Sequence, residues 1–322
     1  MTRRRAATAA IALCLSVGAS PARGQSPTPS APSNLDIQIL LDRRAAAVRS
    51  GDAAAFDDAM RDAPAAYQSR QRRWLRRIRT LPIESYELKI ADQEFGDLAR
   101  GQDHRQGAED VRVLQVSERL KLRGYDARPS NEDLFLTVER RGGKWSIVGD
   151  EATEDLGLRS VRHLWDFGDI RLLERDNVLV VHHPGEAPAA PAILEQARRG
   201  RDRVRRAWPF PWDGRIVVMV PTTVDEIARI LQTTFDLTSF VAFAASSVDR
   251  APGYRLAGDR IFLHWPNFRR YSDSFQTSIL SHELLHIATR SIAGPYISAI
   301  FDEGVAQHYG EGGGETERLR RR

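Results

Sequence analysis

The chain is almost free of cysteine, and this absence limits the kinds of site that it can hold. Cys14 is the only cysteine among the 322 residues. Disulfide bonds within the chain are therefore excluded, and so is a zinc site made of cysteine thiolates. Any metal ion has to be bound by histidine, aspartate or glutamate side chains.

Little net charge remains once the first residues are set apart. The formal charge of the chain is +4, and the first 24 residues contain four arginines and no acidic residue, so the charge of the rest is 4 − 4 = 0. This balance argues against nucleic acid as a partner. The arginine-rich stretches at 70–79 and 198–206 fit the solvated polar faces of amphipathic helices. The alternative is that these faces associate weakly with a membrane surface.

Long hydrophobic runs are absent except for one near the N-terminus. Residues 6–19 form it, behind three arginines, and it is shorter than a helix that spans a bilayer. Small residues and prolines follow, which is typical of a secretory signal peptide at 1–24, cleaved after Gly24 or, as an alternative, after Ala19. The protein is therefore expected to be secreted or extracytoplasmic, or membrane-anchored if the leader is not cleaved. A Pro/Ser linker is expected at 25–33.

The region at 34–152 has the pattern of helices followed by a meander of strands. Apolar residues at helical spacing predict a helix that starts near residue 34 and is interrupted at Gly51, and a second helix at 64–80. Strand-like runs stand at 86–90, 111–122, 133–140 and 144–151. The paired glycines of "RRGGKW" predict a hairpin between the last two. This order predicts an α+β fold.

The same order of elements resembles the nuclear-transport-factor-like or cystatin-like cone fold, with a curved antiparallel sheet. The resemblance covers 34–152 and is one of topology only. Members of that group include enzymes, ligand-binding pockets and dimerisation modules, so the resemblance implies little about chemistry.

A second domain is expected at 160–322, where strands and helices alternate. The expected strands are 177–183, 215–221 and 259–265, and the expected helices are 191–206, 222–231, 272–290 and 297–309. Side chains alternate along a strand, so His264 should share a face with Phe262. His264 then either borders a cleft or is an exposed strand histidine.

The stretch "SHELLHIATR" at 281–290 has the clearest chemical pattern. His282 and His286 are four residues apart, so on a helix they project from one face, one turn apart. Two such imidazoles can share one zinc ion, and Glu283 stands where a general base is needed. Apolar neighbours would bury these groups, which is costly without a partner and favours a metal. The alternative is a helical core that carries two histidines and no metal.

The candidate third ligand is Glu303, in "FDEGVAQHYG" on the next expected helix. A His-Glu-x-x-His pattern followed by Asp-Glu-Gly-x-Ala resembles the gluzincin metallopeptidases, the thermolysin and aminopeptidase class, and is most similar to compact bacterial peptidase MA-like proteins. The resemblance is strong over 250–310 and loose over 160–250.

The resemblance implies a zincin-like mixed sheet, the metal-binding helix and a following ligand helix. It further implies one Zn²⁺ per chain, bound by His282, His286 and Glu303. Peptide bonds of a peptide or protein substrate would be hydrolysed by a zinc-activated water, with Glu283 as the general base.

Three further roles follow from the resemblance. An edge strand before the metal helix pairs with the substrate, and the strand at 259–265 is expected to take this place. Gln307, one turn beyond Glu303, is a candidate partner for a metal ligand. A histidine or tyrosine helps to stabilise the oxyanion. The candidates for this last role are His308, Tyr309 and Tyr296.

One departure from the family leaves other hypotheses open. Gluzincins continue with further helices, whereas this chain ends in "EGGGETERLRRR". The domain is therefore either a minimal member of the family or a truncated one, and truncation would affect catalysis more than metal binding. The alternative function is that of a secreted or surface binding protein with a degenerate, non-catalytic metallopeptidase domain. No site is expected at His182 and His183, which point to opposite faces of a strand, or at His104 and His163, which lack a partner pattern.

Overall fold

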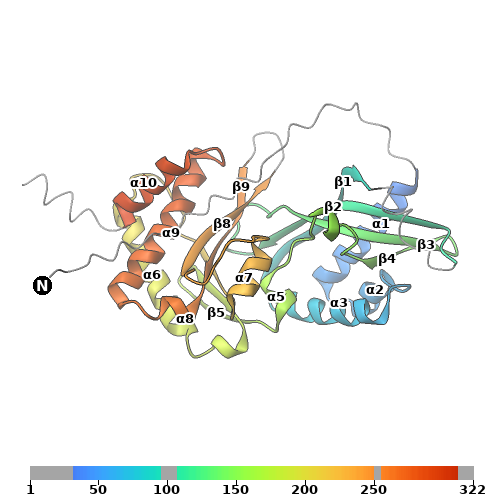
Figure 1. Cartoon of the computed structure of the whole chain (residues 1–322), viewed down its shortest axis with the longest axis horizontal. Coiled ribbons are helices and arrows are strands. Elements are labelled where there is room, and N and C mark those ends of the chain that lie inside the picture. Colours follow the sequence, from blue (N-terminus) through green and yellow to red (C-terminus); the bar gives the residue numbers. More distant parts are fainter. Residues whose placement is uncertain (1–31, 96–106, 250–254, 311–322) are drawn as a thin grey trace, which may run out of the picture.

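The computed structural model describes residues 32–95, 107–249 and 255–310 (Figure 1). The expected signal peptide, most of the expected linker and the tail after residue 310 lie outside these residues. Within them the chain forms helices with one antiparallel and one mixed sheet, so the predicted α+β class is confirmed. None of the described helices is both long and apolar enough to cross a bilayer.

Three helices open the described chain: α1 (Pro32–Ser50), α2 (Ala53–Asp58) and α3 (Ala65–Ile78). The first predicted helix is interrupted at Gly51 as expected, and Asp52 restarts the chain as α2 by accepting a hydrogen bond from the amide of Ala55. α3 buries one apolar face, which includes Trp74 and Ile78. The two predicted helical regions are thus confirmed.

The first sheet is antiparallel and has the order β1-β2-β3-β4. Its strands are β1 (Ile83–Glu94), β2 (Asp110–Leu122), β3 (Glu132–Arg141) and β4 (Lys144–Gly149). The predicted hairpin joins β3 to β4 through Gly142 and Gly143, both with positive φ. All four strands of the meander are confirmed, and β1 is longer at both ends than the predicted strand.

The second sheet is mixed and has the order β5-β6-β7-β9-β8. Its strands are β5 (Arg171–Arg175), β6 (Val178–His182), β7 (Ile216–Val220), β8 (Ala242–Asp249) and β9 (Arg255–Leu263). β6, β7 and β9 run parallel, and the two outer strands pair with them in antiparallel fashion. β6 and β7 are buried along their whole length, as is typical of interior parallel strands.

The edge of this sheet differs from the expectation. The strand predicted at 259–265 is β9, and it lies inside the sheet between β7 and β8. The edge strand next to β9 is β8, which the sequence does not predict because its "AFAASSVD" consists mostly of small residues with weak strand preference. The strand β9 also ends at Leu263, so His264 starts the short helix α8 (Trp265–Phe268) instead of lying in a strand.

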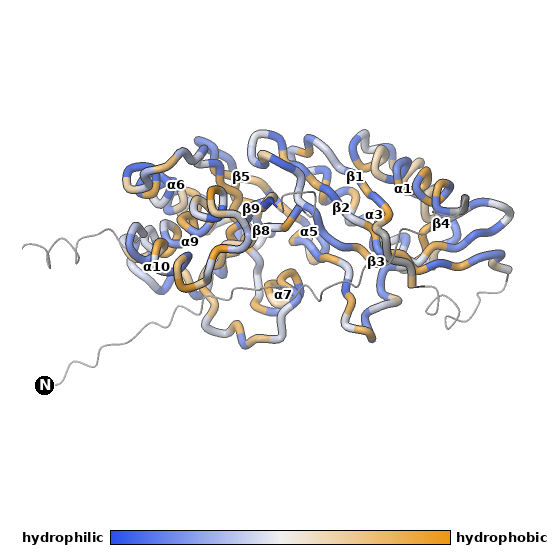
Figure 2. The backbone as a smooth tube through the Cα atoms, turned by 90° about the horizontal axis from the view of Figure 1, so that it is seen from above, coloured by the Kyte–Doolittle hydropathy of each residue, from blue (hydrophilic) through white to orange (hydrophobic). Residues whose placement is uncertain are grey.

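The helices of this half are the short α5 (Leu164–Phe167), α6 (Ala190–Ala207), α7 (Val224–Ile230), α9 (Asp273–Ala293) and α10 (Ala299–Gly310), with 3-10 turns at Glu154–Leu156 and Pro184–Glu186. α6, α9 and α10 lie together at one end of the molecule, and α1 and α3 at the other (Figures 1 and 2). α10 approaches α9 very closely, because a Cβ atom at Gly310 would stand 3.0 Å from the Cα of His282.

Alternate residues of the second sheet belong to two different cores. Val217, Met219 and Phe262 join the core that also contains the helices and strands of the N-terminal half. Val218, Ile261 and Leu263 face the other way, into a core built with α6, α9 and α10. The sheet therefore connects the N-terminal half of the molecule to the helices that carry "SHELLHIATR".

Candidate metal centre

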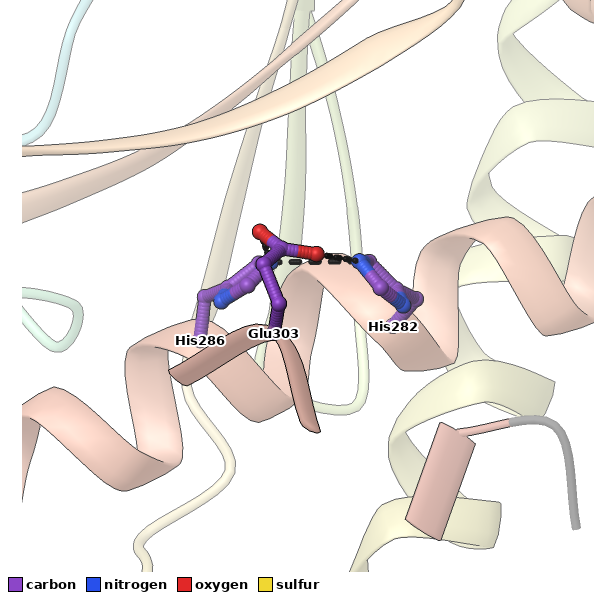
Figure 3. A group of neighbouring side chains, drawn as sticks. All are labelled: His282, His286 and Glu303. Atoms are coloured by element: carbon purple, nitrogen blue, oxygen red, sulfur yellow. Dashed lines mark hydrogen bonds and ion pairs between the residues drawn. The ribbon is translucent and has the colours of Figure 1, made fainter. Parts of the chain in front are cut away.

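Three candidate metal ligands meet between α9 and α10. His282 and His286 lie one turn apart on α9, and Glu303 lies on α10; Figure 3 shows the two rings and the carboxylate pointing toward one another. The two Nε2 atoms are 3.2 Å apart. Oε2 of Glu303 lies 3.3 Å from Nε2 of His282, and Oε1 of Glu303 lies 3.2 Å from Nε2 of His286.

These separations are close to those between the ligands of a zinc ion. Bonds of about 2.0–2.1 Å to zinc place two tetrahedral ligand atoms about 3.3 Å apart. The two Nε2 atoms lie within about 0.1 Å of that value, and the carboxylate of Glu303 spans them with one oxygen toward each ring. Among the residues that the structure describes, this is the one group of three or more such side chains with metal-like proximity. The ligand set inferred from the sequence is thus brought together in space.

Burial and neighbouring charges together shift the pKa values of these groups. Burial, followed by the charge of His286, lowers the pKa of His282 to about 4, so His282 is neutral at pH 7 and keeps a lone pair for a metal. Burial lowers the pKa of His286 as well, but Asp302 and Glu283 outweigh it and the pKa is raised overall. Burial also raises the pKa of Glu283 to about 7.

Asp302 contacts the ligand His286 from behind, and sequence reasoning missed it. Its carboxylate is 1% exposed, and Oδ2 lies 3.0 Å from Nδ1 of His286, a close ion-pair distance outside ideal hydrogen-bond alignment. Arg290 holds the same oxygen, donating from Nε at 2.9 Å. Asp302, and not the exposed Gln307, is the residue of α10 that contacts a candidate ligand in this way. The one available signal was an acidic residue directly before Glu303.

The proposed base is tied to the edge strand. The backbone amide of Ala244 on β8 donates to Oε2 of Glu283 at 2.9 Å. The carbonyl of the same residue accepts a hydrogen bond from Arg290 at 3.1 Å. Both outward-facing backbone groups of Ala244 are therefore held by side chains of α9, which places β8 beside the metal group.

The remaining candidates differ in exposure and in their neighbours. His264 is buried at the start of α8, where its amide donates to the carbonyl of Val241, so it is not an exposed strand residue. His308 is exposed beside Tyr309, whose ring packs edge-on against Trp208. Tyr296 is 77% exposed.

The other described histidines have protein partners. His182 and His183 are buried without sharing a site: Nδ1 of His182 contacts the carbonyl of His183, and His183 pairs with Glu226 at 3.5 Å. His163 contacts Glu118. His104 lies outside the described residues. Comparisons with protein-family models, curated proteins and solved structures gave no match for this chain.

Proposed function

We propose that this protein is an exported zinc-dependent metallopeptidase of the gluzincin type. The observation that carries the proposal is the convergence of His282, His286 and Glu303, with Glu283 on the same helix as the two histidines. Export is inferred from the leader at 1–24. The donor set of two imidazoles and one carboxylate suits zinc and leaves room for a fourth ligand, which is typical of a catalytic site.

Three of the side chains would bind the metal ion, and a fourth would transfer protons. His282, His286 and Glu303 would bind the ion, which supplies a Lewis acid that polarises the scissile carbonyl. Glu283 removes a proton from the attacking water and delivers it to the leaving amine. Its pKa of about 7 suits both steps near neutral pH, because a group with such a pKa accepts and releases a proton with little bias.

Two contacts hold these groups in place. Asp302 fixes the ring of His286, so that Nε2 points at the other ligands. The amide of Ala244 fixes the carboxylate of Glu283 beside the edge strand β8. An extended peptide that pairs with residues of β8 other than Ala244, whose outward groups are already bound, would bring its scissile bond near Glu283.

The alternative is a secreted or surface binding protein whose metal group is not catalytic. The observation that favours it is the position of the three oxyanion candidates, because His308 and Tyr296 are exposed and Tyr309 packs against Trp208. Such a protein would bind zinc without hydrolysing peptides.

Metal content tests the proposal most directly. Residues 25–322, purified without chelator, should contain about one zinc per chain by plasma mass spectrometry, as should the control Gln307→Ala on the same helix. Glu303→Ala should lose most of the metal. No zinc in a folded sample after zinc is added back would refute the proposal, and stoichiometric iron would assign a different metal. Zinc without hydrolysis of any member of a peptide library would favour the binding protein.

A further inference from the structure

The edge strand β8 is held at two places by two parts of the chain. Near Ala244 it is bound by α9, as described above. Three residues later Ser247 accepts a hydrogen bond of 3.0 Å from the amide of Asn131. Asn131 ends the loop between β2 and β3, residues 123–131, here called the β2–β3 loop. The N-terminal half of the molecule therefore reaches the strand that borders the metal group.

A buried ion pair strengthens this contact. Both terminal nitrogens of the Arg260 guanidinium, Nη1 and Nη2, donate to the carboxylate of Asp126 in the β2–β3 loop, at 2.6 and 2.9 Å. The two residues are 9% and 5% exposed. Arg260 lies on β9 directly opposite Ala245 of β8. The pair thus anchors the sheet one residue away from the amide that holds Glu283.

The anchored point is irregular in structure. The register between β8 and β9 shifts between Ala245 and Ser247, which is a β-bulge. Gly258 has a φ of +62° here, and a Cβ atom on it would stand 2.6 Å from the Cβ of Ser130 in the β2–β3 loop. Because the loop leaves no room for a side chain, the bulge and the loop have to fit each other.

We propose that the β2–β3 loop positions the edge strand of the metal site, with Arg260 and Asp126 as positioning residues. The loop fixes the bulge, the bulge sets the position of Ala244, and the amide of Ala244 orients the carboxylate of Glu283. The N-terminal α+β half is then a support for the catalytic cleft. As far as it concerns catalysis, this inference rests on the proposed function.

The test is Arg260→Met in residues 25–322, which keeps the aliphatic stem and removes the charge. Hydrogen exchange in 242–249 should become about tenfold faster or more, while β6 and β7 keep their protection. The zinc content should stay unchanged, and kcat for a peptide substrate should fall about tenfold with a smaller change in KM. Arg260→Lys should restore part of both effects.

The control is Arg162→Met, which breaks a partly buried ion pair of 2.7 Å with Asp150, outside both β8 and the β2–β3 loop. It should lower stability without faster exchange in 242–249. Ser247→Ala, which removes a single hydrogen bond, should give a smaller change in the same direction as Arg260→Met and replaces it if that variant does not fold.

Exchange in 242–249 that is unchanged in both β8-directed variants, or that rises equally with Arg162→Met, would overturn the proposal. If the zinc-loaded protein hydrolyses no peptide, the proposed function fails, but the exchange data still decide whether the loop positions β8.

Discussion

Two clusters of histidine and glutamate in this molecule are built from the same residue types and differ in where their polar atoms point. In the N-terminal half, Glu118 is 2% exposed and both of its oxygens have partners: the hydroxyl of Tyr86 at 2.7 Å and Nε2 of His163 at 2.6 Å. Between α9 and α10, His282, His286 and Glu303 direct their ligand atoms toward one common point.

The difference separates a structural cluster from a candidate site. Burial raises the pKa of Glu118, but His163 and Tyr86 outweigh it, so the pKa is lowered; burial lowers the pKa of His163, but Glu118 outweighs it, so the pKa is raised. The two groups therefore form a completed ion pair. His282 instead has a pKa of about 4 and stays neutral. A histidine with a glutamate beside it indicates a metal only where the lone pairs converge.

The largest effect is expected from the base of the metal group. Glu283→Gln should reduce peptide hydrolysis about a thousandfold, because the amide cannot accept the proton, while zinc stays bound. Steady-state kinetics with metal analysis of the same sample measures both. If the variant keeps its activity, Glu283 is not the general base, and its role would be structural like that of Glu118.

The second effect concerns the structural cluster. Glu118→Gln should lower the free energy of unfolding by about 3 kcal/mol and leave zinc binding intact, because His163 loses its buried counter-charge. Denaturant unfolding at several pH values measures it.

The loss should depend on pH in a defined window. The depressed pKa of Glu118 contributes stability above about pH 4.5, and this is lost as pH falls through the folded-state value. The raised pKa of His163 contributes stability below about pH 6.5, and this is lost as pH rises through the folded-state value. The effect of Glu118→Gln should therefore be greatest between these values, and a loss that is equal at pH 5.5 and pH 9 would contradict the ion pair.

The smallest effect is expected from the contact behind His286. Asp302→Asn should weaken zinc binding about 10- to 100-fold, because the neutral amide orients and polarises the imidazole less well than the carboxylate. Competition with a chromogenic chelator measures the dissociation constant. Gln307→Ala serves as the control on α10 and should leave the zinc dissociation constant unchanged. An equal loss of zinc affinity in both variants would mean that Asp302 acts only through the stability of the helix.

Local spacing along the chain was enough to predict part of the site. His282, Glu283 and His286 owe their arrangement to the 3.6-residue period of one helix, which their own sequence favours. Most helices and the four-strand meander were predicted for the same reason, since each shows its own apolar period. β8 was missed because a strand of alanine and serine carries no such period, and its place is set by the strand beside it.

The sequence by itself determined most of the elements, the two histidines on one helix face with Glu283 beside the first of them, and Glu303 as the candidate third ligand. Only the tertiary structure decided that β8 and not β9 forms the edge, that Asp302 and not Gln307 contacts a ligand, and that the β2–β3 loop reaches the bulge. The physical reason is the separation along the chain of the residues that interact. Helical neighbours meet through backbone geometry within one turn, whereas Asp126 and Arg260, 134 residues apart, meet only once two sheets have packed.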